Sequence, residues 1–102
     1  MLVVGLDGAT LDLVRPWAEA GHLPNLRRLM AEGAWGRLQS TLPPVTAPAW
    51  ASFMTGKHPS GHGVFDFFRG RAGVFDLIDA GAIAGPTLWR LLSQAGVSAG
   101  VL

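Results

Sequence analysis

Asp7 and Thr46 are the two side chains whose positions in the sequence suggest chemistry. Asp7 follows an apolar run at residues 2–6 that predicts a buried strand, and it precedes Gly8. Ligands bind at the carboxyl ends of strands in open α/β sheets, so a carboxylate there could hold a divalent cation. An Asp-Gly pair is equally typical of an ordinary turn. The position alone leaves both interpretations open.

Thr46 lies just before Pro48, at the predicted start of a helix. A hydroxyl at a helix N-cap usually accepts a hydrogen bond from the first turn, and this is the simpler interpretation. The positive end of the helix dipole also attracts phosphate groups. A threonine there could attack phosphorus if a metal lowered the pKa of its hydroxyl.

Two further patterns do not develop into sites. His58 and His62 are four residues apart, but the proline and glycine between them argue against one helix carrying both. We therefore expect residues 57–63 to form a loop, with a metal-binding histidine pair as the lesser alternative. The Gly-Lys pair at residues 56–57 lacks both the upstream glycine and the following Ser or Thr of a phosphate-binding P-loop.

Strands and helices are predicted to alternate along the chain. The patterns predict strands at 2–6, 34–41 and 97–102, a hairpin within 64–79 that turns at 69–71, and four helices. One helix is closed by Gly21, and the others run from Pro24 to Gly33, from near Thr46 to Gly56, and from Pro86 to Gly96. This alternation favours an α/β layered fold with a largely parallel sheet. We expect Trp50 and the phenylalanines of residues 65–68 to lie in its core.

Composition excludes several classes of protein. The chain has 102 residues, which fits one domain, and its 49% hydrophobic content argues against disorder. The net charge is +1 and the basic residues are scattered, so a nucleic-acid surface is not predicted. There is no cysteine, signal-peptide pattern or long apolar stretch, and we expect a cytoplasmic protein without a membrane segment. Nothing indicates an oligomeric state.

Five short motifs resemble one family when they are taken in order. They are VVGLDG at 3–8, LPNLRRL at 23–29, PPVTAPAW at 43–50, FMTG at 53–56 and HPSGHGV at 58–64. Together they resemble the type I phosphodiesterase/nucleotide pyrophosphatase branch of the alkaline phosphatase superfamily. The resemblance is strong over residues 2–64. It implies that residues 1–102 are the N-terminal part of a single catalytic domain, an α/β three-layer sandwich that is incomplete in this chain.

The resemblance also implies a reaction. Thr46 would be a nucleophile that forms a covalent phosphothreonine, and Asp7 would bind the same metal that activates the Thr46 hydroxyl. Two divalent ions are implied, usually zinc, with manganese or magnesium as alternatives. The substrate would be a small phosphoester or nucleotide, with phosphodiester or pyrophosphate bonds hydrolysed. The sulfatase branch is disfavoured, because a threonine at position 46 cannot give the formylglycine that sulfatases need.

The family's remaining metal ligands are absent from these 102 residues. We therefore expect the isolated chain to be inactive, and the uncovered strand at 97–102 suggests that the fold continues. Two alternatives stay open. One is a small, non-catalytic α/β domain that binds an anion or a partner, with Thr46 as a cap and Asp7 as a turn residue. The other is a phosphomonoesterase or phosphomutase of the same superfamily.

Overall fold

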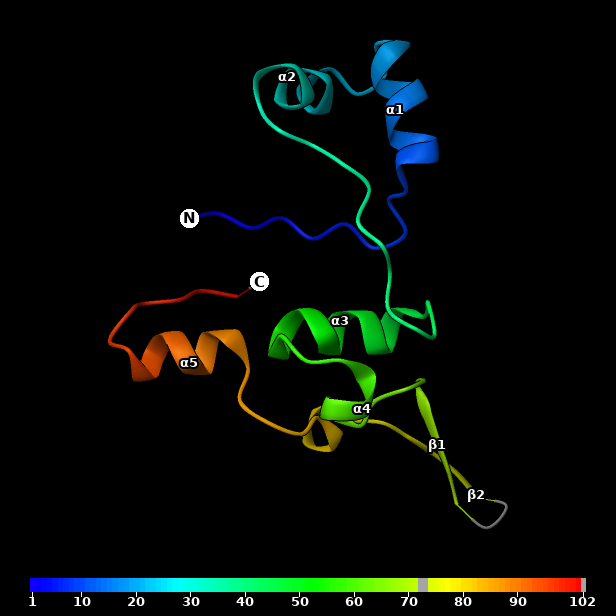
Figure 1. Ribbon diagram of the computed structural model, residues 1–102, viewed down its shortest axis with the longest axis vertical. Helices are drawn as coiled ribbons and strands as arrows, with labels where there is room; N and C mark the ends of the chain where they lie inside the picture. The colour runs from blue at the N-terminus through cyan, green and yellow to red at the C-terminus, as the bar shows by residue number, and fades with distance from the viewer. Residues whose placement is uncertain (72–73, 102) are drawn as a thin grey trace. The chain divides into compact units, whose positions relative to one another are not determined.

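The computed structural model describes residues 1–71 and 74–101 and divides into two compact units (Figure 1). The first unit is Met1–Gln39 and the second is Ser40–Leu102. Each is described by itself below.

The first unit is a pair of short helices. Helix α1 (Leu11–Glu19) begins after Thr10, whose hydroxyl accepts a hydrogen bond from the Asp12 N–H at 3.3 Å. Helix α2 (Pro24–Glu32) opens on a proline, as the sequence predicted, and packs against α1. The buried apolar side chain of this unit is Ala18, which is small. The helices therefore have little apolar burial to stabilise them.

Charged side chains supply the other contacts of the first unit. Arg15 pairs with Glu19 one turn later at 2.8 Å and stacks over the Trp35 ring at 6.0 Å. Arg37 pairs with Asp12 at 2.6 Å. Both ion pairs are largely exposed, so each contributes on the order of 0–1 kcal/mol.

The second unit contains the longest helix and the sheet. Helix α3 (Thr46–Thr55) packs against α4 (Pro59–His62) and α5 (Leu88–Gln94). Strands β1 (Phe68–Arg71) and β2 (Val74–Leu77) pair antiparallel, with Phe68 opposite Leu77. A 3₁₀ turn (Ala80–Ala82) then leads toward α5. Figure 1 shows the hairpin as a separate arm beyond α4.

The four predicted helices are confirmed, although the last begins at Leu88 and not at Pro86, and a short helix was missed. Residues 59–62 were expected to be a loop, but Pro59 occupies the first position of α4. Its missing N–H is not needed there, so the proline starts a helix instead of breaking one. Gly63 ends α4 in the left-handed conformation, at φ 79°. Among the described residues, no helix has the length and apolar character needed to cross a membrane.

The hairpin is confirmed, but its turn was misplaced. Residues 69–71 were predicted to form the turn and instead lie within β1. The link between the strands falls at residues 72–73, outside the described residues. The neighbouring aromatic cluster was predicted to be core and is exposed: Phe65, Phe67 and Phe68 each show about half of their surface to solvent. Trp50 is half-buried and packs edge-to-face against Phe53, with ring centroids 5.8 Å apart.

The predicted parallel sheet is not formed by the described residues. Residues 2–6, 34–41 and 97–101 are not strands there, and residue 102 lies outside the description. A strand is held by hydrogen bonds to a neighbouring strand, so an apolar run alone does not make one. Leu2 and Val4 of the first run are 87% and 70% exposed. The described residues form a mixed helix-and-strand α/β structure with one small antiparallel sheet.

Candidate active-site residues

Asp7 lies in a turn between the extended N-terminal run and helix α1. Gly8 follows it in the left-handed conformation, at φ 68°, which a side chain would disfavour. The Thr10 N–H donates to the Gly8 carbonyl at 3.0 Å, so the turn leads directly to the α1 cap. Asp7 is exposed. The residue therefore lies at the surface of the first unit.

Thr46 is the first residue of α3 and is half-buried. Val45 occupies the cap position, and its carbonyl accepts the first helical hydrogen bond from the Ala49 N–H at 3.1 Å. The loop before it is ordered around Pro43, whose carbonyl accepts from the Thr41 hydroxyl at 2.9 Å and the Val45 N–H at 3.0 Å. The cap interpretation of Thr46 is thus off by one residue. The positive end of the helix dipole lies at the Thr46 side chain.

The two predicted site residues belong to different units. Asp7 is in the first and Thr46 in the second, and each unit is described only by itself. The structure therefore gives the local setting of each side chain and no single described site that contains both.

Metal-binding side chains are sparse in the part of the chain that the structure describes. No group of three or more His, Cys, Asp or Glu there could hold a metal ion. A catalytic zinc site commonly takes three protein ligands, whereas the implied set here supplies only the Asp7 and Thr46 oxygens. The described residues therefore do not fit a complete metal centre, and any further ligands would have to come from outside them.

His62 has a setting that the sequence analysis missed. It was predicted to lie in a loop, yet its surface is 0% exposed, at the centre of the second unit. Its Nε2 lies 2.8 Å from the Ser52 hydroxyl of α3, and its Nδ1 accepts the Val64 N–H at 3.2 Å. Ala51 and Val64 are buried with it. No local pattern signalled this burial, because it depends on how α4 packs against α3.

Burial lowers the pKa of the His62 imidazole below its ordinary value of 6.5, because the charged form loses hydration. The positive charge of Lys57 lowers this pKa further, and a hydrogen bond to the Pro48 backbone opposes both. His62 is therefore a neutral ring at pH 7, and its two nitrogens have different roles.

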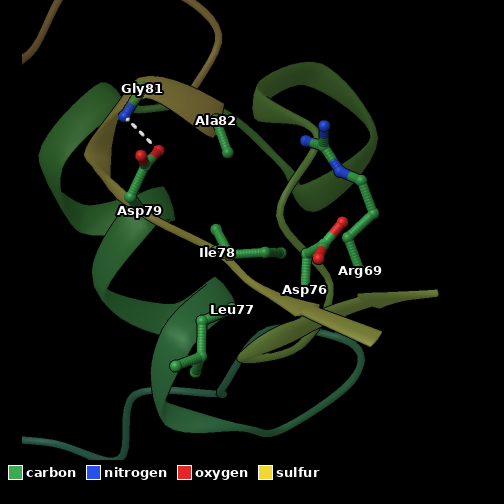
Figure 2. Close-up of a pocket in the computed structure, with 7 residues that line it drawn as sticks. All are labelled: Arg69, Asp76, Leu77, Ile78, Asp79, Gly81 and Ala82. Carbon is green, nitrogen blue, oxygen red and sulfur yellow. Dashed lines mark hydrogen bonds between the residues drawn. The ribbon is translucent and has the colours of Figure 1, made fainter. Parts of the chain in front are cut away.

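An open hollow of about 400 Å³ lies beside the hairpin (Figure 2). Its lining includes Arg69, Asp76 and Asp79 and contains neither Asp7 nor Thr46. Figure 2 shows the Asp79 carboxylate turned toward Gly81, whose N–H donates to it at 2.9 Å. One carboxylate is thus used for a local turn. The hollow is distinct from the residues that the motifs single out.

Comparison with known proteins defines the class. The model of the type I phosphodiesterase/nucleotide pyrophosphatase family matches residues 1–102. The chain is thus related to hydrolases of phosphodiester and pyrophosphate bonds, and it belongs to this family. A search of curated proteins found no match, and neither did a search of solved structures.

Proposed function

We propose that residues 1–102 are the N-terminal part of a metal-dependent phosphoester hydrolase domain, with Thr46 as nucleophile and Asp7 as a metal ligand. The observation that carries this proposal is the family match over the whole chain, which includes both residues. Two local features support it. Thr46 begins a helix, where phosphate binding is favoured, and Asp7 is exposed in a turn after an extended run.

The complete domain would be a three-layer sandwich with a largely parallel sheet. Residues 2–6 and 97–101 would become strands of that sheet. Their apolar composition and exposure support this, since Leu2 is 87% and Val101 is 63% exposed. Side chains of this kind gain about 25 cal/mol for each Å² removed from water.

The proposed chemistry has two steps. The Thr46 oxygen attacks phosphorus, a new P–O bond forms, and the ester or anhydride P–O bond breaks as the leaving group departs with a proton. Water then hydrolyses the phosphothreonine, which releases the phosphoryl product and restores the hydroxyl. Two divalent ions, zinc or else manganese or magnesium, would supply charge stabilisation when bound.

The substrate would be a small phosphoester or nucleotide acted on in the cytoplasm. Net charge of +1 and scattered basic residues give no surface for a nucleic-acid polymer. A diesterase and a monoesterase of this superfamily would share the same nucleophile. Relative turnover of a phosphodiester and a phosphomonoester distinguishes these two activities.

The test is release of nitrophenol from a nitrophenyl phosphodiester by the protein with its whole catalytic domain. We expect turnover that is lost on chelation and restored by zinc. Thr46→Ala should abolish it, and Thr46→Ser, which keeps a hydroxyl, should retain part of it. A phosphoryl group trapped on residue 46 by acid quench would be detected by mass spectrometry. Turnover in Thr46→Ala equal to that of the wild type would refute the assigned nucleophile.

A second candidate is a non-catalytic domain that binds an anion or a partner. The observation that favours it is the lack of a metal-binding group among the described residues. The same assay on residues 1–102 alone should show no turnover under either proposal. Activity of the whole protein separates them.

A further inference from the structure

His62 lies where several segments of the second unit meet. Its ring contacts α3, and its own carbonyl accepts the Ala84 N–H at 2.9 Å. Lys57 donates to the Ala84 carbonyl at 3.2 Å. Both backbone polar groups of Ala84 are therefore hydrogen-bonded to residues 57–62. The chain around the ring is the most buried part of the second unit. Burying a polar side chain at such a point costs free energy of folding unless its hydrogen bonds are made.

The hydrogen bonds of His62 fix its tautomer. The Val64 N–H can only donate, so Nδ1 must be the unprotonated nitrogen. Nε2 then carries the proton and donates to the Ser52 hydroxyl oxygen. This direction excludes a Ser-His nucleophile pair, because His62 would have to accept the Ser52 proton at Nε2 to act as its base.

The His62 ring contacts one face of α3. Its Nε2–H donates to the Ser52 hydroxyl of α3 at 2.8 Å, and Pro48 lies four residues before Ser52 on the same helical face. Pro48 is itself fully buried, two residues after Thr46. The Ser52 contact thus acts on the helix whose first residue is Thr46.

We infer that His62 is a positioning residue for the proposed reaction: it holds α4 on α3 through Ser52, and so fixes the helix that begins at Thr46. The inference rests on the proposed function. Its physical basis is that a nucleophile displaced by about 1 Å can lose on the order of 100-fold in rate. His62 acts through α3 and is not placed in contact with the substrate.

Substitutions can separate the two ring nitrogens. In His62→Gln the side-chain amide extends about as far as Nε2 and keeps a donor for Ser52. In His62→Asn the amide reaches only about as far as Nδ1, and the donor to Ser52 is lost. Ser52→Ala removes the hydroxyl that accepts the hydrogen bond from Nε2 of His62. His58→Gln is the matched control, since His58 is exposed and lies outside the contact.

The kinetic test compares kcat and KM for these variants in the whole catalytic protein. We expect His62→Asn and Ser52→Ala each to lower kcat by about 10–100-fold with KM changed little. His62→Gln should recover most of kcat, and His58→Gln should match the wild type. The double variant His62→Asn/Ser52→Ala should lose no more than either single one, because both remove the same contact.

Nitrogen-15 NMR of the histidine rings supplies a measurement that does not depend on activity. We expect the signal lost in His62→Asn to be that of a neutral ring protonated at Nε2. A ring protonated at Nδ1, or wild-type kcat in both His62→Asn and Ser52→Ala, would overturn the inference. If the wild type shows no Thr46-dependent turnover, the proposed function fails first, and the positioning role falls with it.

Discussion

Asp7 and Thr46 are held by two regions with different means of stabilisation. The region around Asp7 is a surface turn followed by two helices that bury little more than Ala18 and are joined by exposed ion pairs. In the region around Thr46, His62 contacts helix α3 through Ser52. Pro48, Ala51 and Val64 are buried in the same region. This difference suits the roles proposed for them, Thr46 as nucleophile and Asp7 as metal ligand. Attack on phosphorus depends on direction, whereas a carboxylate can adjust to a bound cation.

The largest expected effect separates the two roles by their response to metal. Thr46→Ala removes the attacking oxygen and should lower kcat by about 10⁴-fold or more, at every zinc concentration. Asp7→Asn should lower activity by more than the roughly 10–100-fold typical of an outer-shell ligand partner, and added zinc should restore part of it. The measurement is kcat against zinc concentration for both variants. If zinc restored both variants equally, the two roles would not differ.

Enlarging a buried alanine should cost more stability in the second region than in the first. Ala51 is 1% exposed on α3, so Ala51→Leu should cost about 1–3 kcal/mol of stability. The matched variant is Ala18→Leu, since Ala18 is 2% exposed on α1. We expect a smaller loss of stability there, because fewer buried side chains surround Ala18 and they can move to make room. Hydrogen exchange of amides in residues 1–39 and 40–101 would locate each effect. A larger cost at Ala18 would reverse the comparison.

Acid should weaken the second region before the first. Burial lowers the pKa of His62, so the unfolded chain binds a proton more readily than the folded one. Stability is therefore fully present above about pH 6.5 and is lost as the pH falls from there through the lowered pKa of His62. Denaturation at several pH values should show this slope for the wild type and a shallower one for His62→Gln. An unchanged slope would argue that the ring is not buried.

The smallest expected effect is in the first region. Arg37→Ala breaks the exposed pair with Asp12 and should cost less than about 1 kcal/mol. Added salt at 1 M should reduce the difference between the variant and the wild type, because exposed charges are screened. Thermal unfolding at low and high salt measures this. A cost above 2 kcal/mol would mean that the pair is better protected from water than its exposure indicates.

Local signals predicted the helices well. Pro24 and Pro48 in first turns and Gly33 and Gly56 after last turns are read from the chain directly, and the structure has helices at these places. The same local logic failed at residues 59–62, since one-turn helices depend on what they pack against. The hairpin was found from its alternation, but a short strand pattern does not fix where the turn falls.

The sequence predicted the residues of the candidate site, Asp7 and Thr46. It did not predict the side chains that position them. Motif order singled out Asp7 and Thr46, and the family match covers both. His62 gave no such signal, because its role depends on Ser52, ten residues away on another helix, and on the direction of a backbone N–H.

The sequence by itself determined the family, the places of the four longer helices, and the two residues proposed for chemistry, because these depend on residue types at short spacings. The tertiary structure alone decided that His62 is buried and neutral, that Val45 and not Thr46 caps α3, and that residues 65–68 are exposed. These depend on which segments pack together. Burial and hydrogen-bond direction are set by neighbours distant in the chain, and no local pattern contains them.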